Sequence, residues 1–359
     1  MKPTKVLPAN DTFGVLNAVV DLMQDKHALF VAPFEINGLM PEVHGLADEV
    51  ANDVALVVDS SGSTGAPKRI ELSRSALEAS ALASAQYLGG HGQWLLTLPV
   101  NFIAGLNVLI RSVIADSQPV MMNTQLPFTA DGFFRSASLL SGDKRYTSLV
   151  PIQLERIYKL VSQDHSLYSL LRRFDAILIG GQRPDGSVIE SLRKEGVNLV
   201  TSYGMTETSG GCIYNGETLD GVELKLDDQL ISIAGPVLAN GLGPWFQTND
   251  LGELVDGKLK VTGRADRVII SGGLKVSLEL VEDHARRLPG VEDVAAVAFD
   301  SEWGQSVAIA YVGTEEASFD SLIRLSEAAK VRATKRLEVL PRLISGKPDL
   351  VAIARLFTE

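Results

Sequence analysis

The sequence predicts an α/β protein: a large amino-terminal domain of layered, mostly parallel sheets with a small β module, followed by a small α+β domain. Its 359 residues exceed the usual size of one domain. Short apolar runs alternate with helical patterns as far as residue 201, which is typical of parallel sheets covered by helices. Turn residues become frequent after residue 213. We expect the domains at residues 1–265 and 266–359.

The amino-terminal domain is predicted from this alternation. Residues 1–12 have the composition of a polar lead-in. Strands are expected at residues 28–32, 55–58, 70–72, 94–98, 119–122, 147–150, 175–179 and 198–201. Helices are expected at residues 13–23, 74–88, 103–114, 131–140, from residue 152, and at 185–194. Ligands of such folds bind at the carboxyl ends of the strands.

The carboxyl-terminal half has a different pattern. Between residues 213 and 261, short β-prone pieces are separated by turn pairs such as Asp256-Gly257, which predicts a compact hairpin-rich module. Beyond it we expect strands at residues 268–270, 291–299 and 307–312, helices at 278–288 and 319–329, and a last segment at 336–340. These elements form the small α+β domain.

Composition and charge exclude several classes of function. Apolar residues make up 45% of the chain and charged ones 21%, as in ordinary folded proteins. The net charge of -11 disfavours binding to nucleic acid or to anionic membranes. No apolar run approaches the roughly 20 residues that span a bilayer, so we expect no membrane insertion. With a single cysteine, Cys212, and no secretory signal, a cytoplasmic location is expected. The five histidines are scattered, so no zinc or iron site is expected.

Residues 60–68 form the segment best suited to bind an anion. Its glycines admit close approach of the backbone, while N–H groups, hydroxyls and Lys68 supply donors and positive charge. It differs from a P-loop because Gly62 and Gly65 are too close and Pro67 precedes Lys68. Taken alone, it could instead be a solvated turn. The residues expected to hold phosphate are Ser60, Ser61, Gly62, Ser63, Thr64, Gly65 and Lys68.

Two further loops at strand ends carry polar or glycine-rich sequence. Gly180-Gly181-Gln182 follows one strand and residues 202–208 follow the next. In the second loop, Tyr203 offers a ring face for a base and Glu207 a carboxylate for a metal ion, although a tyrosine here could also serve only for packing. Asp250, Arg264 and Lys347 stand in turns, where by themselves they would be ordinary solvated residues.

Six blocks in this order resemble the adenylate-forming superfamily of acyl-CoA synthetases, peptide-synthetase adenylation domains and luciferases. The resemblance runs from about residue 50 to the end of the chain. The blocks are residues 60–68, Leu98-Pro99 to Gly105, Gly180-Gly181, residues 203–208, Asp250 with residues 263–266, and Ser345-Gly346-Lys347.

The resemblance implies a two-step reaction that uses ATP, Mg²⁺ and coenzyme A (CoA). A carboxylate attacks the α-phosphate of ATP to give an acyl-adenylate and pyrophosphate, and a thiol then displaces AMP. It also implies the roles of the nucleotide-binding residues. These are residues 60–68 for the outer phosphates, Gly180, Gly181 and Gln182 for the adenine edge, Ser202, Tyr203, Gly204 and Met205 around the adenine, Thr206 for the α-phosphate, Glu207 for Mg²⁺, and Asp250 with Arg264 for the ribose.

The small domain carries the remaining roles that the resemblance implies. Lys347 matches the catalytic lysine of adenylation, which acts together with Thr206 and Glu207. Asp266 matches the hinge about which the small domain rotates between the two steps. The loop of Gly272, Gly273 and Lys275 matches the CoA-binding face.

A finer resemblance points to the acid. Leu98-Pro99 with Ile103 to Leu106, and residues 148–154, look most like o-succinylbenzoate–CoA ligases of menaquinone biosynthesis in actinobacteria. The unreactive carboxylate of that acid needs a cation, for which we predict Arg111, the alternative being an arginine paired with Asp116. The remaining acid-binding candidates are Asn101, Gly204 and Ser209. Asn101 stands where many relatives have histidine or an aromatic residue.

Three other functions stay open. The chain could be a CoA ligase for another small aromatic or aliphatic acid. It could be a stand-alone adenylation enzyme that loads a carrier protein, or a nucleotide-binding protein without catalysis. A homodimer is possible.

Overall fold

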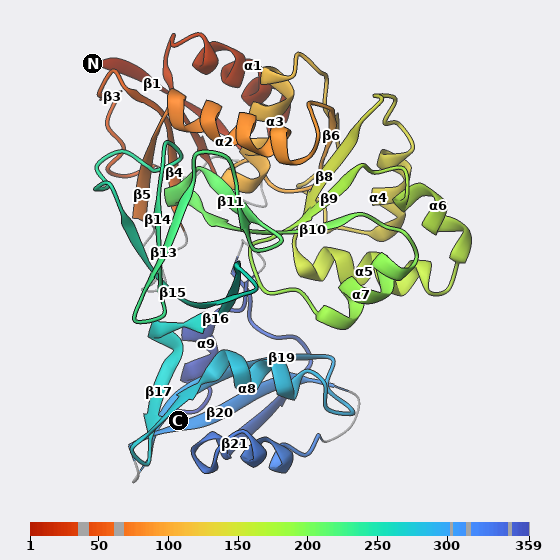
Figure 1. Cartoon of the computed structure of the whole chain (residues 1–359), viewed down its shortest axis with the longest axis vertical. Coiled ribbons are helices and arrows are strands. Elements are labelled where there is room, and N and C mark those ends of the chain that lie inside the picture. Colours follow the sequence, from red (N-terminus) through yellow and green to blue (C-terminus); the bar gives the residue numbers. More distant parts are fainter. Residues whose placement is uncertain (35–42, 61–67, 302–303, 314–316, 344–346, 359) are drawn as a thin grey trace. The chain divides into compact units, whose positions relative to one another are not determined.

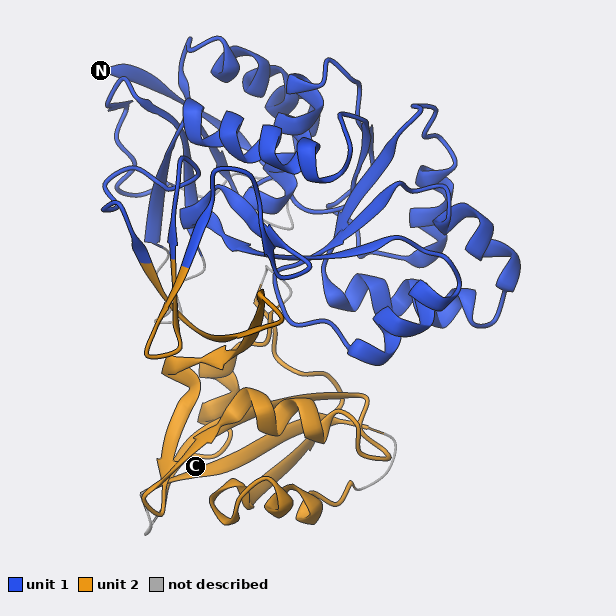
Figure 2. Ribbon diagram, in the orientation of Figure 1, with its two compact units in different colours: residues 1–224, 233–246 blue, residues 225–232, 247–359 orange. Residues whose placement is uncertain are grey.

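The computed structural model describes residues 1–34, 43–60, 68–301, 304–313, 317–343 and 347–358. Internal contacts divide the chain into two compact units, residues 1–224 with 233–246 and residues 225–232 with 247–359 (Figure 2). None of the helices in the described ranges has the length and apolar character needed to cross a membrane. The domain boundary expected at residue 265 stays a prediction.

The first unit begins with a five-stranded sheet in the order β3-β1-β2-β4-β5 (Figure 1). Its strands are β1 (Lys2–Pro8), β2 (Ala28–Ala32), β3 (Glu49–Val50), β4 (Val54–Ser60) and β5 (Lys68–Ser73), with α1 (Thr12–Met23) between the first two. The expectation of a polar lead-in at residues 1–12 is wrong. β1 pairs in parallel with β2 and antiparallel with β3, so it lies inside the sheet.

The second sheet of this unit has seven strands in the order β12-β11-β10-β9-β8-β6-β7. Neighbours from β7 to β10 run parallel, and β11 and β12 are antiparallel, so the prediction of an α/β fold is confirmed. The strands are β6 (Gln93–Leu96), β7 (Val120–Met121), β8 (Arg145–Leu149), β9 (Ala176–Ile179), β10 (Leu199–Met205), β11 (Gly210–Tyr214) and β12 (Glu217–Thr218). Because β8, β9 and β10 are parallel, the loops after them lie at one edge of the sheet.

Helices follow the strands much as the sequence predicts. They are α2 (Arg74–Tyr87), α3 (Ile103–Ile114), α4 (Ala130–Ala137), α5 (Pro151–Val161), α6 (Tyr168–Leu171) and α7 (Gly186–Lys194). The oxygen of Ser73 accepts a hydrogen bond from the backbone N–H of Ala76, as expected of a helix cap. In the core beside α4, Phe133 stacks against Phe174 with ring centroids 5.8 Å apart.

The second unit contains one complete sheet and part of another. β13 (Glu223–Asp227), β14 (Leu230–Ala234), β15 (Phe246–Val255) and β16 (Lys258–Arg264) form the predicted β module. The other sheet has the order β18-β17-β20-β19, with β21 on β20, and comprises β17 (Val268–Ser271), β18 (Leu274–Ser277), β19 (Asp293–Ser301), β20 (Gly304–Val312) and β21 (Val331–Leu337). Helices α8 (Leu278–Ala285) and α9 (Leu350–Arg355) accompany it.

The helix predicted at residues 319–329 is wrong. The structure has two short 3₁₀ turns there, η4 (Asp320–Arg324) and η5 (Glu327–Ala329). Phe319, Leu322 and Leu325, which pack into the core of this unit, recur every three residues. That spacing matches the three residues per turn of a 3₁₀ helix better than the 3.6 of an α-helix.

A buried ion pair stabilises the second unit. The guanidinium of Arg267 donates to both carboxylate oxygens of Glu282, at 2.8 and 3.1 Å, and to the carbonyl of Ala296 at 2.8 Å. Glu282 also accepts from the N–H of Ala296 at 2.7 Å. Burial by itself would lower the pKa of Arg267, but the charge and hydrogen bonds of Glu282 raise that pKa above its ordinary value. The pair therefore ties α8 to β19.

Candidate active site

The predicted phosphate segment closes the hairpin of β4 and β5. Ser60 ends β4 and lies opposite Lys68, which begins β5, and its hydroxyl donates to the Lys68 carbonyl at 3.0 Å. The intervening candidates Ser61, Gly62, Ser63, Thr64 and Gly65 lie outside the described residues. The strands on both sides are those that the sequence predicts.

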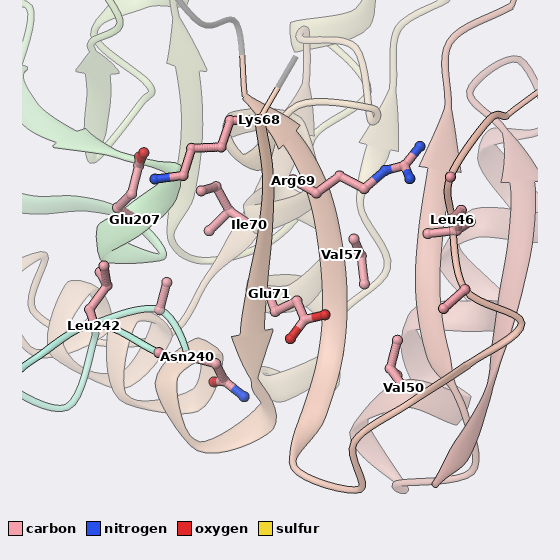
Figure 3. Close-up of a pocket in the computed structure, with 14 residues that line it drawn as sticks. Leu46, Val50, Val57, Lys68, Arg69, Ile70, Glu71, Glu207, Asn240 and Leu242 are labelled. Carbon is pink, nitrogen blue, oxygen red and sulfur yellow. The ribbon is translucent and has the colours of Figure 1, made fainter. Parts of the chain in front are cut away.

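A cavity of about 370 Å³ lies beside β5 in the first unit. Lys68, Glu71, Glu207 and Asn240 are among the residues that line it. Figure 3 shows the side chains of Lys68 and Glu207 pointing toward one another, one from β5 and the other from the turn after β10. The structure thus brings the predicted phosphate lysine and the predicted metal ligand to one cavity.

Arg69, which also lines this cavity, has its charge satisfied elsewhere. Its Nε lies 3.3 Å from the carboxylate of Asp59, and its Nη2 donates to the carbonyl of His44 at 2.6 Å. In Figure 3 its side chain points away from Glu207. Lys68 rather than Arg69 therefore stays the residue predicted to bind phosphate.

The turn that carries Thr206 and Glu207 is a short 3₁₀ segment, η2 (Thr206–Thr208), directly after β10. The Thr208 hydroxyl accepts from the N–H of Met205 at 3.0 Å and donates to the carbonyl of Gly210 at 2.8 Å. Thr208 is fully buried, whereas Thr206 and Glu207 are half-buried. The turn is therefore anchored by its inner residues and presents the two predicted catalytic side chains.

Ser209 differs from its predicted role. It is fully buried and left-handed, with φ of 53°, and its hydroxyl donates to the carbonyl of Val237 at 2.8 Å. The prediction that Ser209 contacts the acid is not supported, because its hydroxyl already has a backbone partner. Its carbonyl accepts from Ser80 at 3.1 Å and from Asn107 at 2.9 Å, so Ser209 shapes the turn instead.

The predicted adenine loops are neighbours in the first unit. Gly180, Gly181 and Gln182 follow β9, and the strand carrying Ser202, Tyr203, Gly204 and Met205 pairs with β9 in parallel. A Cβ on Gly204 would lie 2.0 Å from the carbonyl oxygen of Gly210, so only glycine fits there. Tyr203 is half-buried, which leaves part of its ring accessible for stacking.

Asn101 is half-buried in the loop that leads into α3. The helix starts close to this loop, since a Cβ on Gly105 would lie 2.2 Å from the carbonyl oxygen of Pro99. The glycine of the Leu98-Pro99 to Gly105 block therefore permits the tight entry into α3. The role of Asn101 stays a prediction.

Arg111 is buried in α3 with only 6% of its surface exposed. Its guanidinium lies over the ring of Trp94, 4.9 Å from the centroid, and donates to the hydroxyl of Tyr214 at 3.1 Å. Among the described residues Arg111 contacts no carboxylate, so the alternative pairing with Asp116 is not observed. Its buried Nε has no hydrogen-bond partner in the described part of the chain. A small cavity of about 10 Å³ beside it has room for about one water molecule.

In the second unit, Arg264 joins the predicted ribose acid to the predicted hinge. Its Nη1 donates to Asp250 at 3.1 Å, and its Nε and Nη2 donate to Asp266 at 2.9 and 2.6 Å. The hydrogen bonds with Asp266 raise the pKa of Arg264 above its ordinary value. The three residues form one charged cluster on neighbouring strands and the following turn.

The predicted CoA loop is a two-residue hairpin between β17 and β18. Gly272 and Gly273 have φ of 56° and 83°, the positive values that such tight hairpins require. Lys275 is exposed on β18. The loop is thus an accessible tip of the second unit.

Lys347 is exposed just before α9. Its carbonyl accepts from the N–H of Leu343 at 2.8 Å, and Pro348 bridges to Arg342. The adjacent residues 344–346 lie outside the described ranges. Asp349 caps α9 by accepting from the N–H of Ala352 at 3.0 Å, so the backbone around the lysine is held on its carboxyl-terminal side.

Comparisons with known proteins agree with these features. Residues 15–242 match the family of AMP-binding enzymes. A probable 2-succinylbenzoate–CoA ligase of Mycobacterium tuberculosis H37Rv is 38% identical over 354 residues, covering 92% of this chain and 91% of that protein. The chain belongs to the AMP-binding enzyme family. The predicted resemblance is therefore confirmed.

Two further proteins are similar at lower sequence identity. The 2-succinylbenzoate–CoA ligase of Listeria monocytogenes (strain F2365) is 30% identical over 82% of this chain and 68% of its own length. The o-succinylbenzoate CoA synthetase of Bacillus subtilis, solved with its acyl-adenylate, superposes with a TM-score of 0.76 at 22% identity, covering 98% of this chain and 88% of that one. This superposition confirms the fold.

The donor set fits the magnesium ion that AMP-binding enzymes use. No group of three or more His, Cys, Asp or Glu side chains able to hold a metal occurs in the part of the chain that the structure describes. Mg²⁺ commonly binds through one or two carboxylates together with substrate phosphates. Glu207, half-buried beside the cavity that Lys68 also lines, suits that mode.

Sequence reasoning did not single out Asn107. It is buried in α3, within the apolar run Leu106 to Ile110, and it donates to the turn after Glu207. A lone amide in an apolar helical run was the available signal, because a buried amide requires a hydrogen-bond partner.

Proposed function

We propose that this AMP-binding enzyme is an ATP-dependent acid–thiol ligase that converts o-succinylbenzoate to its CoA thioester. The observation that carries the proposal is 38% identity, over nearly the full length of both chains, to a protein described as a probable 2-succinylbenzoate–CoA ligase. The shared cavity of Lys68 and Glu207 supplies the chemistry that the first step needs.

The first step is adenylation. A carboxylate oxygen of the acid attacks the α-phosphorus of ATP, and the bond to the β-phosphate oxygen breaks to release pyrophosphate. Lys68 faces the charge that builds on the leaving phosphates, and Thr206 donates to the α-phosphate. Glu207 would hold Mg²⁺, which neutralises phosphate charge.

The second unit completes the reaction. Lys347 donates to the α-phosphate and the acid carboxylate during adenylation. After rotation about Asp266, the hairpin of Gly272 and Gly273 meets CoA, whose thiolate attacks the acyl carbon and expels AMP. Arg264 contacts both the ribose acid Asp250 and the hinge Asp266, so nucleotide binding and the hinge share one guanidinium.

Arg111 is the proposed anchor for the second carboxylate of the acid. A buried guanidinium without a carboxylate partner carries an uncompensated charge, which a dicarboxylate ligand would neutralise. The adjoining cavity of about 10 Å³ is too small for a carboxylate. The contact therefore runs through a water molecule or requires a shift of α3.

The function is tested by supplying ATP, Mg²⁺ and CoA with a panel of acids: o-succinylbenzoate, benzoate and medium-chain fatty acids. Selective pyrophosphate release and CoA-thioester formation with o-succinylbenzoate are expected. Equal turnover of benzoate would favour another acid. Pyrophosphate release without any CoA thioester would instead indicate a carrier protein as acceptor.

The role of Lys347 has its own test. Lys347→Ala should slow pyrophosphate release by about 10²- to 10³-fold, because it removes a donor to charge that develops in the transition state. Thiolysis of supplied acyl-adenylate should stay within about threefold of wild type. Lys335→Ala, which removes an exposed lysine of β21 in the same unit, is the matched control. Equal loss of both steps would contradict the assignment.

The homodimer and the cytoplasmic location stay predictions. Size-exclusion chromatography with light scattering addresses the first, and cell fractionation the second.

A further inference from the structure

The turn carrying Thr206 and Glu207 is held by side chains from two helices beneath it. Asn107 of α3, 3% exposed, donates its amide hydrogen to the carbonyl of Ser209 at 2.9 Å. Ser80 of α2, 1% exposed, donates to the same carbonyl at 3.1 Å. Ser209 is in the left-handed region, with φ of 53°, which a non-glycine residue adopts only when its surroundings stabilise it.

Asn107 also fits closely under the residue after this turn. A Cβ on Gly210 would lie 2.2 Å from the amide nitrogen of Asn107. The neighbours of Asn107 along α3 are buried apolar residues, so an amide is costly there unless it makes its hydrogen bond. Asn107 therefore both donates a hydrogen bond to the turn and packs closely against the residue that follows it.

The outer side of the same turn is fixed separately, because the N–H of Ala239 donates to the carbonyl of Glu207 at 2.9 Å. These attachments are at the carbonyls of Glu207 and Ser209, with only Thr208 between the two residues. With both carbonyls held, the backbone that carries Glu207 is fixed beside the cavity that its side chain shares with Lys68.

We propose that Asn107 is a positioning residue that sets Glu207 and Thr206 for the magnesium and phosphates of ATP, with Ser80 as its partner on the same carbonyl. The inference rests on the roles given above to Thr206 and Glu207. It adds a residue that touches neither nucleotide nor metal and acts through the backbone of Ser209.

The test compares Asn107→Leu with Ser112→Ala. The control removes a buried hydrogen bond from the same helix, since the Ser112 hydroxyl donates to the Val108 carbonyl at 2.8 Å without contacting the turn. ATP binding is measured by calorimetry with Mg²⁺ and with EDTA, in the absence of any acid. The gain in affinity from Mg²⁺ should fall about five- to tenfold in Asn107→Leu, the usual weight of one hydrogen bond, and less than twofold in the control.

Kinetics give a second readout. The Mg²⁺ concentration for half-maximal pyrophosphate release should rise by a similar factor in Asn107→Leu, while KM for the acid stays within twofold. Ser80→Ala should shift both quantities in the same direction by less, because Asn107 still holds the carbonyl. Ser80→Ala also keeps the proposal testable if Asn107→Leu does not fold.

Cys212 on β11 separates positioning from general loosening. Burial raises the pKa of its thiol to about 12, so alkylation of the native protein is slow and reports opening of the strand. An unchanged gain from Mg²⁺ in Asn107→Leu would overturn the proposal. The proposal would also be overturned if ATP affinity in EDTA, KM for the acid and the alkylation rate of Cys212 all changed together. Such a result would indicate that Asn107 has only a structural role.

The acid assignment can fail separately. If the wild type does not turn over o-succinylbenzoate but binds ATP in a way that depends on Mg²⁺ and Asn107, the substrate is wrong and the positioning role stands.

Discussion

A buried arginine in the first unit and a largely buried one in the second have opposite surroundings. Arg267 lies between carboxylates, with Glu282 at 2.8 Å and Glu279 at 3.9 Å. Arg111 faces the ring of Trp94 and the hydroxyl of Tyr214, and among the described residues it contacts no carboxylate. The first cation is neutralised by the protein itself. The charge of Arg111 has no carboxylate to neutralise it among the described residues.

The difference separates a structural charge from a functional one. Burying a charge is costly unless a partner compensates it, so a structural cation is expected with its partner in the fold. A buried cation without such a partner suggests that a ligand supplies the counter-charge. Arg267 belongs to the first kind, and we propose that Arg111 belongs to the second.

The largest expected effect is on the stability of the second unit. Arg267→Met leaves the buried Glu282 without its cation, which should cost about 3–5 kcal/mol. Hydrogen–deuterium exchange in peptides from β19 and β20 measures this loss. Arg286→Met is the control, because its single ion pair with Asp283, at 3.5 Å, is partly exposed and worth at most about 1 kcal/mol. Equal losses of stability in Arg267→Met and Arg286→Met would show that the ion pair of Arg267 contributes no more than a partly exposed one.

The next effect is on substrate binding in the first unit. Arg111→Met should raise KM for o-succinylbenzoate by about tenfold or more, as expected for a hydrogen bond to a charged group. KM for ATP should change less than twofold. Stability should change by no more than about 1 kcal/mol, since no carboxylate loses its partner.

The outcome for Arg111 is checked by steady-state kinetics and by urea unfolding of the same preparations. An acid with a single carboxylate, if it is turned over at all, serves as the internal control because its KM should not respond. A stability loss as large as that of Arg267→Met, with KM unchanged, would make Arg111 a structural residue.

The smallest expected effect concerns Glu279. Burial raises its pKa above the ordinary value of 4.5, although the charge of Arg267 opposes this. The protonated form is therefore favoured by folding, and this contribution is lost as the pH rises through the raised pKa. Glu279→Gln should be as stable as wild type near pH 5 and slightly more stable at pH 7, by less than about 1 kcal/mol. Urea midpoints at the two pH values measure the change, and a variant less stable at pH 7 would contradict it.

The fold could be predicted where patterns are local. Alternating strands and helices placed most elements of the first unit. β1 was missed because Lys2–Pro8 contains two prolines and two lysines, and its place inside the sheet depends on pairing with Ala28–Ala32 and Glu49–Val50. The 3₁₀ turns after Phe319 were missed because a three-residue spacing was read as helical.

The identities of the site residues could be predicted from the sequence better than the contacts that these residues make. Lys68 and Glu207, far apart in sequence, line one cavity as the ordered blocks suggested. The surroundings of Arg111 were not predictable, since its hydrogen-bond partner Tyr214 is more than a hundred residues away, while the partner considered from sequence, Asp116, was local. Asn107 was missed, and Ser209 was predicted to contact the acid, for the same reason. The side chains of both residues donate to backbone carbonyls that only the tertiary structure brings close to them.

β5 ends the five-stranded sheet, and a strand in that position can pair with another chain. Lys68, Arg69 and Glu71 stand along it, and charged side chains on an end strand discourage such aggregation. Lys68 thus has a second expected effect besides its proposed binding of phosphate. Replacing it with an apolar residue would also lower the solubility of the folded protein, whereas glutamine would leave the strand polar.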